Sequence, residues 1–171
     1  PIREAIRKLE LEGLVLMIPR KGAEVAEITE KNLRDVLEVR GALEELAVQL
    51  ACERMDNEKL KELHAAADHF REILDSDDIT AIGEADEAFH DVIFAATDNT
   101  RLIQLLNNLR EQMYRYRIEY LKKKECHPQL LEEHAAIMKA IEEHDKEKAT
   151  QITIQHIANQ ADTVVDTLRH R

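Results

Sequence analysis

Glycine and proline are scarce in this chain, which has only four glycines and three prolines among 171 residues. Leucine, alanine, glutamate and lysine are abundant instead, and these residues favour long helices over sheets. From residue 29 onward, apolar side chains recur at helical spacing between short polar breaks. This pattern predicts six helices, over about residues 29–55, 57–74, 80–96, 100–124, 127–143 and 145–168. Because the breaks are short, we expect neighbouring helices to be antiparallel and to form an all-α bundle.

The first 28 residues follow a different pattern. Residues 1–12 are typical of a helix that Gly13 ends, and two short apolar stretches flank a basic turn at residues 19–22. The sequence therefore predicts two domains: residues 1–28, a helix followed by a β-hairpin, and residues 29–171, the helical bundle. Since the chain begins with Pro rather than Met, we expect residues 1–28 to be the end of a longer domain.

Charge separates the same two parts of the chain. The formal net charge is −11, although residues 1–25 carry five basic and four acidic side chains. An acidic surface repels DNA, so any contact with nucleic acid should lie in the first segment. The two cysteines suit a reducing cytoplasm, and we see neither a signal peptide nor an apolar run that could span a membrane.

Four residues with metal-binding side chains lie at inward-facing positions. Asp86 and His90 are one turn apart on the apolar face of their helix, and His134 and His156 lie in the apolar rows of two later helices. One carboxylate and three imidazoles suit a divalent transition metal. Zinc and nickel are the first choices, and manganese and iron are also compatible. The alternative is a metal-free interaction module whose buried histidines are only hydrogen-bonded.

A second pair with the same spacing provides a comparison. His64 and Asp68 are also four residues apart, but they lie on a polar stripe of their helix, opposite its apolar row. We therefore expect this pair to lie at the solvated surface.

Several motifs resemble one family. Residues 1–15, PIREAIRKLELEGLV, resemble the end of the winged helix-turn-helix of GntR-family regulators, and residues 20–25 resemble its wing. Residues 37–44 resemble the start of the FadR-type sensing domain, called FCD. The stretches DxxFHxxI (86–93), EHxxI (133–137) and HI (156–157) follow the metal-binding pattern of that domain in order. Six helices rather than seven resemble its shorter, VanR-like variant.

The resemblance implies a ligand-responsive bacterial transcription factor, in many cases a repressor, that binds operator DNA as a homodimer. It places Arg3 where the recognition helix meets bases, and Arg7, Arg20 and Lys21 where they reach phosphates. The alternative for each of them is a solvated charge. Two helices that precede the recognition helix in the family do not occur in this sequence. We therefore expect these 171 residues alone to bind DNA poorly.

The resemblance also implies a small organic acid as effector. Three neutral imidazoles and one carboxylate give a divalent site a net charge of about +1, which favours an anion. Arg40, on a mostly apolar helix, is our first candidate for a second anchor, with Arg117 and Tyr120 as further candidates. The alternative for Arg40 is a salt bridge with Glu44 one turn away.

An all-helical metal-dependent hydrolase is the competing hypothesis. His–Asp dyads at His90–Asp91 and His144–Asp145 resemble one class of phosphohydrolases, and Glu133 could serve as a base. In that mechanism Asp91 would bind the metal instead of Asp86. Asp145 is better explained as a helix cap, and the sequence offers no clear nucleophile, so we do not expect an enzyme.

Overall fold

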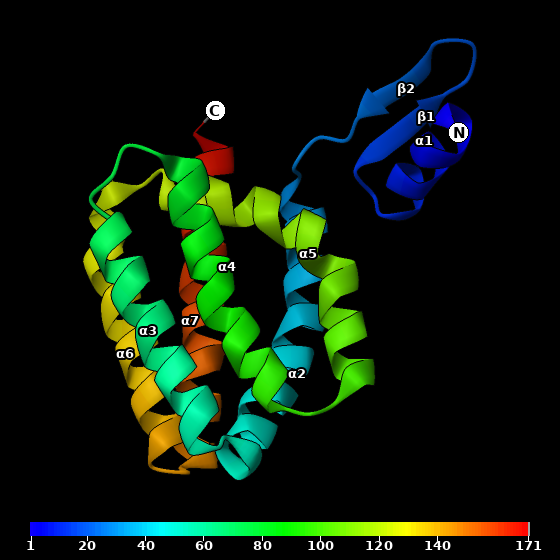
Figure 1. The fold of residues 1–171 in the computed structure, drawn as a ribbon. Helices are drawn as coiled ribbons and strands as arrows, with labels where there is room; N and C mark the ends of the chain where they lie inside the picture. The colour runs from blue at the N-terminus through cyan, green and yellow to red at the C-terminus, as the bar shows by residue number, and fades with distance from the viewer. Residues whose placement is uncertain (171) are drawn as a thin grey trace.

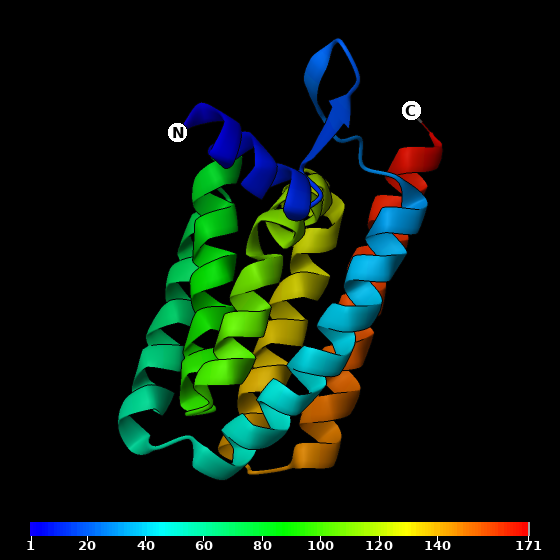
Figure 2. The same ribbon diagram turned by 90° about the vertical axis from the view of Figure 1, so that its right-hand side faces the viewer.

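The computed structural model describes residues 1–170. Six long helices form an antiparallel bundle, and a short helix with a two-stranded hairpin lies beyond the end of the bundle where the last helix finishes (Figures 1 and 2). The elements are α1 Ile2–Leu11, β1 Val15–Ile18, β2 Gly22–Val25, α2 Glu30–Arg54, α3 Asn57–Ile73, α4 Ile79–Ala96, α5 Thr100–Leu121, a 3₁₀ turn Lys124–Cys126, α6 His127–Glu142 and α7 Lys146–Arg169. This arrangement confirms the predicted all-α bundle.

Side-chain caps explain where most of the bundle helices begin. Five of them start after a residue whose side chain accepts a hydrogen bond from the backbone N–H three positions later, namely Thr29, Asp56, Asp78, Asn99 and Asp145. Each such cap stabilises its helix by about 1 kcal/mol. The sequence-based boundaries at Thr29 and Asp145 are therefore confirmed. At the other end of α5 the prediction was three residues too long, because the helix stops at Leu121 before the 3₁₀ turn.

The interior of the bundle has a polar layer between two apolar clusters. Along α2, Leu33 and Leu37 belong to one cluster and Ala47 and Val48 to the other. Most of the buried polar side chains come from inward-facing positions along the helices and form this layer: Arg40, Glu44, Asp86, His90, Arg117, His134, Thr153, His156 and Gln160. Within the described chain, no helix is long and apolar enough to cross a membrane.

The N-terminal hairpin is small and regular. β1 and β2 pair antiparallel, with Val15 opposite Val25 and Ile18 opposite Gly22. Gly13 has a φ of 71°, a left-handed conformation that ends α1 at the position expected from the sequence. The chain then leaves the hairpin through residues 26–29 and enters α2.

Candidate metal centre

Three histidines from three helices converge in the polar layer. His90 of α4, His134 of α6 and His156 of α7 are all buried, and their ring centroids are 5.3 to 5.4 Å apart. One ring nitrogen from each lies within 4.8 Å of those of the other two. Nitrogens this close, on three separate helices, can reach a single ion between them.

Aromatic neighbours hold the rings in place. Phe89 stacks on His134 with centroids 4.2 Å apart and an angle of 12° between the planes. Phe70 contacts the same ring at 4.9 Å, and Phe89 meets His90 edge-on at 5.4 Å. The rings of His90 and His134 therefore occupy set positions before any ligand binds, which is the preorganisation that a metal site needs.

The protonation of His90 and His134 suits metal binding. Burial lowers the pKa of His90 well below its usual range, and burial also lowers the pKa of His134. Both rings are therefore neutral at pH 7, the form that binds metals. Nε2 of His90 and both ring nitrogens of His134 are buried without a hydrogen-bond partner. A buried polar atom without a partner costs about 1–3 kcal/mol, and a metal ion would remove that cost.

His156 is oriented by a carboxylate. Its Nδ1 lies 2.7 Å from Oε2 of Glu133, which also accepts a hydrogen bond from Asn159. Burial alone would raise the pKa of Glu133, but the hydrogen bonds from His156 and Asn159 lower it, so Glu133 is ionised. With Nδ1–H donated to Glu133, Nε2 carries the lone pair that faces the cluster. Carboxylates orient metal-binding histidines in this way in many proteins.

Asp86 lies beside the three histidines rather than among them. Its Oδ2 is 2.5 Å from Nε of Arg117, and its Oδ1 is 3.3 Å from Nε2 of His134. Neither contact has hydrogen-bond geometry, since both carboxylate oxygens lack a hydrogen-bond partner. Burial would raise the pKa of Asp86, but the Arg117 guanidinium and His134 hold it well below its usual range. The carboxylate is therefore charged, and its role as a metal ligand stays a prediction.

Arg40 takes part in a buried polar chain. Its Nε donates to Glu44 at 2.6 Å, the salt bridge named as the alternative, and its Nη1 donates to Oε1 of Gln160 at 2.7 Å. Gln160 in turn contacts Nε2 of His156 at 3.1 Å. The remaining nitrogen, Nη2 of Arg40, is buried without a partner. Arg40 is thus linked to the histidine cluster and still has one donor for a ligand.

Sequence reasoning missed Gln160 and the role of Glu133. Gln160 lies one turn after His156 on the inward face of α7, so the helical spacing contained a signal for it. For Glu133 the only signal was its place next to His134, and the sequence could not show that it reaches His156 on another helix.

Arg117 stands between two narrow cavities. One, of about 10 Å³, includes Arg40, Gln160 and Tyr116 in its lining, and the other, of about 20 Å³, includes His90 and Arg110. A space of this size has room for about one water molecule. An organic acid could therefore enter only if side chains moved. Arg117 lines both cavities, so a movement of its side chain would join them. Tyr120 is buried too, and burial raises the pKa of its hydroxyl.

The His64–Asp68 pair and the acidic residues of the two His–Asp dyads lie outside the histidine cluster. His64 and Asp68 are exposed, and Asp68 pairs with Arg71 at 2.7 Å, in agreement with the surface assignment. Asp91 is half-exposed and pairs with Arg110 at 2.8 Å. Asp145 caps α7 through the N–H of Lys148, as the sequence indicated. The described structure does not bring the His–Asp dyads together.

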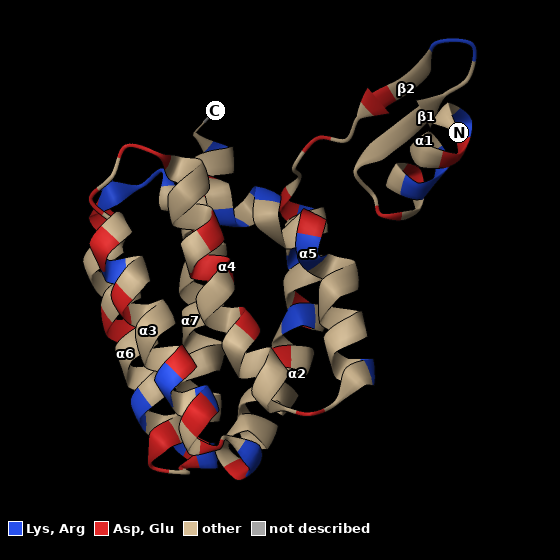
Figure 3. Cartoon of the chain, viewed as in Figure 1, with Lys and Arg blue, Asp and Glu red and all other residues tan. Residues whose placement is uncertain are grey.

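The basic residues predicted to contact DNA are all in the first segment and exposed. Arg3 and Arg7 lie on α1, whereas Arg20 and Lys21 lie in the turn of the hairpin. Figure 3 shows these blue segments away from the bundle, which carries most of the red, acidic positions.

Comparisons with known proteins identify the family. Residues 35–159 match the FCD domain family. The HTH-type transcriptional repressor GlaR of Escherichia coli is 30% identical over 166 residues, covering 92% of this chain and 75% of GlaR. The gluconate operon transcriptional repressor of Bacillus subtilis is 27% identical over 172 residues, covering 97% of this chain and 70% of that repressor.

Solved structures agree with this assignment. E. coli McbR/YncC has a TM-score of 0.86 at 19% identity, over 96% of this chain and 83% of that one. A GntR-family regulator from Pseudomonas syringae has a TM-score of 0.65 at 26% identity, over 99% and 70% of the two chains. The relatives are transcriptional regulators rather than enzymes, which argues against the hydrolase hypothesis. The chain therefore belongs to the GntR family of transcriptional regulators with an FCD domain.

Proposed function

We propose that this regulator binds one divalent transition metal and a small organic acid in its helical bundle, and that this binding controls attachment to operator DNA. Residues 29–171 form the sensor domain in this proposal, and residues 1–28 form the end of a winged helix-turn-helix. The observation that carries the proposal is the convergence of His90, His134 and His156 in a closed interior, where ring nitrogens of His90 and His134 have no hydrogen-bond partner.

The donor set favours zinc or nickel. Imidazole nitrogens and one carboxylate suit both ions, and they also accept manganese or iron. The three histidines would hold the metal, and Glu133 would keep His156 in the tautomer whose Nε2 faces it. Gln160, now 3.1 Å from that nitrogen, would then turn away and remain available to Arg40 or to a ligand.

Asp86 would be the fourth protein ligand of the metal, and its ion pair with Arg117 would weaken as a result. A carboxylate bound to a metal no longer balances a guanidinium 2.5 Å away as fully as it does in this structure. Since Arg40 and Glu44 already neutralise each other, the loaded interior would have a net positive charge. A small carboxylate could supply the balancing charge, with Arg117 and the free nitrogen of Arg40 as its anchors.

The relatives support a regulatory response to acids. One of them is the repressor of a gluconate operon, and gluconate is a carboxylate. As in other regulators of this kind, we propose that a homodimer binds the operator and that Arg3, Arg7, Arg20 and Lys21 contact the DNA. The acidic surface of the bundle would stay away from the phosphates.

Metal content and melting temperature test the proposal. We expect one metal per chain in the wild type and in His64→Ala, with metal raising the melting temperature of both. His134→Ala should lose the metal and that stabilisation, since it removes one ligand from the centre of the cluster. Retention of metal by His134→Ala, or its loss in His64→Ala, would contradict the assignment of the site.

A further inference from the structure

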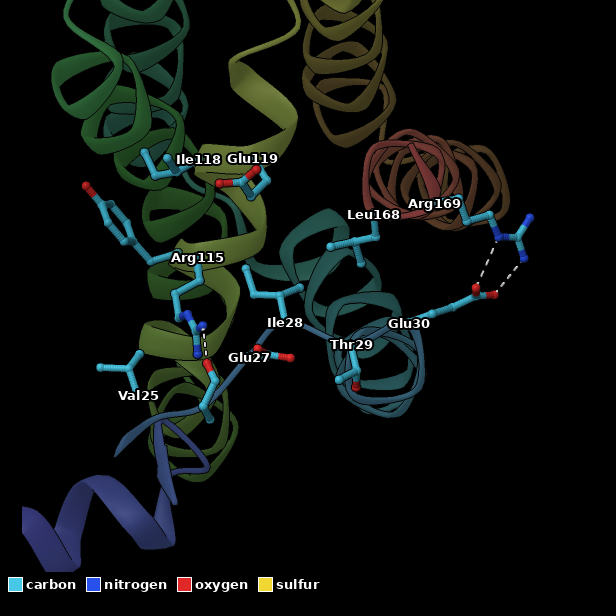
Figure 4. Close-up of a pocket in the computed structure, with 12 residues that line it drawn as sticks. Val25, Glu27, Ile28, Thr29, Glu30, Arg115, Ile118, Glu119, Leu168 and Arg169 are labelled. Carbon is cyan, nitrogen blue, oxygen red and sulfur yellow. Dashed lines mark hydrogen bonds and ion pairs between the residues drawn. The ribbon is translucent and has the colours of Figure 1, made fainter. Parts of the chain in front are cut away.

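One helix of the bundle holds the N-terminal segment at two backbone carbonyls. Gln112 of α5 donates through Nε2 to the carbonyl of Glu12, directly after α1. Arg115, almost one turn later, donates through Nη2 to the carbonyl of Ala26 at 2.6 Å, directly after β2 (Figure 4). The N–H of Ala26 donates to the carbonyl of Leu14. The two side chains therefore fasten α5 to both ends of the hairpin.

The opposite side of α5 contacts the metal centre. Arg117 pairs with Asp86 at 2.5 Å, and Arg110 pairs with Asp91 at 2.8 Å and with Glu87. Residues 110, 113 and 117 follow the spacing of one helical face, whereas residues 112 and 115 are each turned about 200° from residues 110 and 113. The same two turns of α5 thus touch the buried carboxylate on one side and the hairpin on the other.

An open groove runs along the connector between the hairpin and α2. The groove, of about 910 Å³, is lined by residues 25–30, by α5 and by the end of α7, where Leu168 and Arg169 lie. At its far end Arg169 pairs with Glu30, at the start of α2, at 3.0 Å. Because the groove is open and residues 27–29 keep solvent exposure, this part of the connector can shift, whereas Ala26 is buried where Arg115 holds it.

We propose that α5 transmits the state of the metal centre to residues 1–28, with Gln112 and Arg115 as the residues that position this segment. The inference rests on the proposed metal site. When Asp86 binds a metal, Arg117 loses its closest partner, and α5 takes a new position relative to α4. The carbonyls of Glu12 and Ala26 follow α5, so the hairpin and α1 change their orientation on the bundle.

Hydrogen exchange measured by mass spectrometry on the 171-residue chain tests this inference. The readout is the exchange of peptides that cover residues 12–28, with and without zinc. We expect zinc to change their exchange in the wild type, and we expect that response to be lost in Gln112→Ala/Arg115→Ala while zinc still binds. Arg101→Ala is the matched control, since Arg101 is an exposed residue of α5 whose side chain donates to Gln104 within the same helix.

A second set of measurements, made without metal, tests this inference independently of the proposed metal site. Arg117→Ala breaks the same ion pair without zinc, so it should also change the exchange of residues 12–28, and the double variant should block that change. If zinc does not bind, the metal site is refuted and the measurements without metal alone decide the role of α5. Two results would overturn the inference. In one, zinc binds but neither zinc nor Arg117→Ala changes the exchange of residues 12–28. In the other, that exchange changes as much in Gln112→Ala/Arg115→Ala as in the wild type.

Discussion

The helical bundle and the first 28 residues use arginine in different ways. In the bundle, Arg40 and Arg117 are 4% and 6% exposed and each contacts a buried carboxylate, whereas Arg3, Arg7 and Arg20 are open to solvent. A buried charge depends strongly on its partner, because its loss leaves the other charge unsolvated. An exposed charge contributes little to folding and stays free to bind another molecule. In the proposed function, the buried arginines set the state of the sensor and the exposed ones contact DNA.

Removal of a buried arginine should have the largest effect on stability. Arg117→Ala leaves Asp86 charged and buried, so the metal-free protein should lose about 3–5 kcal/mol of its free energy of unfolding in urea. With zinc bound the loss should be smaller, because the metal then balances Asp86. An equal loss with and without zinc would show that Asp86 is not a ligand, and Arg101→Ala should change neither value.

Acidification should have the second-largest effect on stability, since burial lowers the pKa of both His90 and His134. The unfolded chain protonates these rings near pH 6.5, whereas the folded chain keeps them neutral. Below about pH 6.5 the metal-free protein should therefore lose up to about 1.4 kcal/mol per pH unit for each histidine. Asp86 and Glu133, whose pKa values are also lowered, add to the loss only below about pH 4.5.

Unfolding in urea at a series of pH values measures this effect. His134→Gln should give a flatter profile between about pH 6.5 and 5, and the exposed His64→Gln should keep the wild-type slope. A wild-type profile that is flat over this range would mean that the buried rings become protonated without cost, against the pKa values inferred from their burial.

A smaller effect is expected at Arg40, and it concerns binding rather than folding. Arg40→Met/Glu44→Met removes both buried charges together, so the interior stays balanced. Calorimetry with gluconate and with malate should show affinity lower by about 10- to 100-fold, because hydrogen bonds to charged groups contribute about 1.5–3 kcal/mol. Metal content should not change. Asp91→Ala should alter neither metal nor ligand binding, and a loss of metal in that variant would favour the hydrolase hypothesis again.

The exposed basic residues should have the smallest effect on folding. Arg20→Ala and Lys21→Ala should change the free energy of unfolding by less than about 0.5 kcal/mol. In the full-length regulator each should reduce the salt dependence of operator binding by about one unit of slope, while Arg3→Ala should relax sequence specificity. Fluorescence anisotropy measures both. Tight, sequence-specific binding by residues 1–171 alone would contradict the prediction that these residues by themselves bind DNA poorly.

Local sequence determined the helices and the direction in which their side chains point. The start of the first bundle helix near residue 29 and the cap at Asp145 were visible in the sequence, and helical spacing alone placed His90, His134 and His156 inward. It also separated them from His64, which lies on a polar stripe and is exposed. These features depend on residues three or four positions apart, and the geometry of one helix fixes such distances.

Only the tertiary structure decided which of these groups meet. Nothing in the spacing shows that Glu133 orients His156, that Arg117 pairs with Asp86, or that Gln160 joins Arg40 to the cluster. The contacts of Gln112 and Arg115 with the carbonyls of Glu12 and Ala26 were equally hidden. The physical reason is that each contact joins separate elements, so it depends on which elements become neighbours and at what distance, and no repeat along a single helix records that.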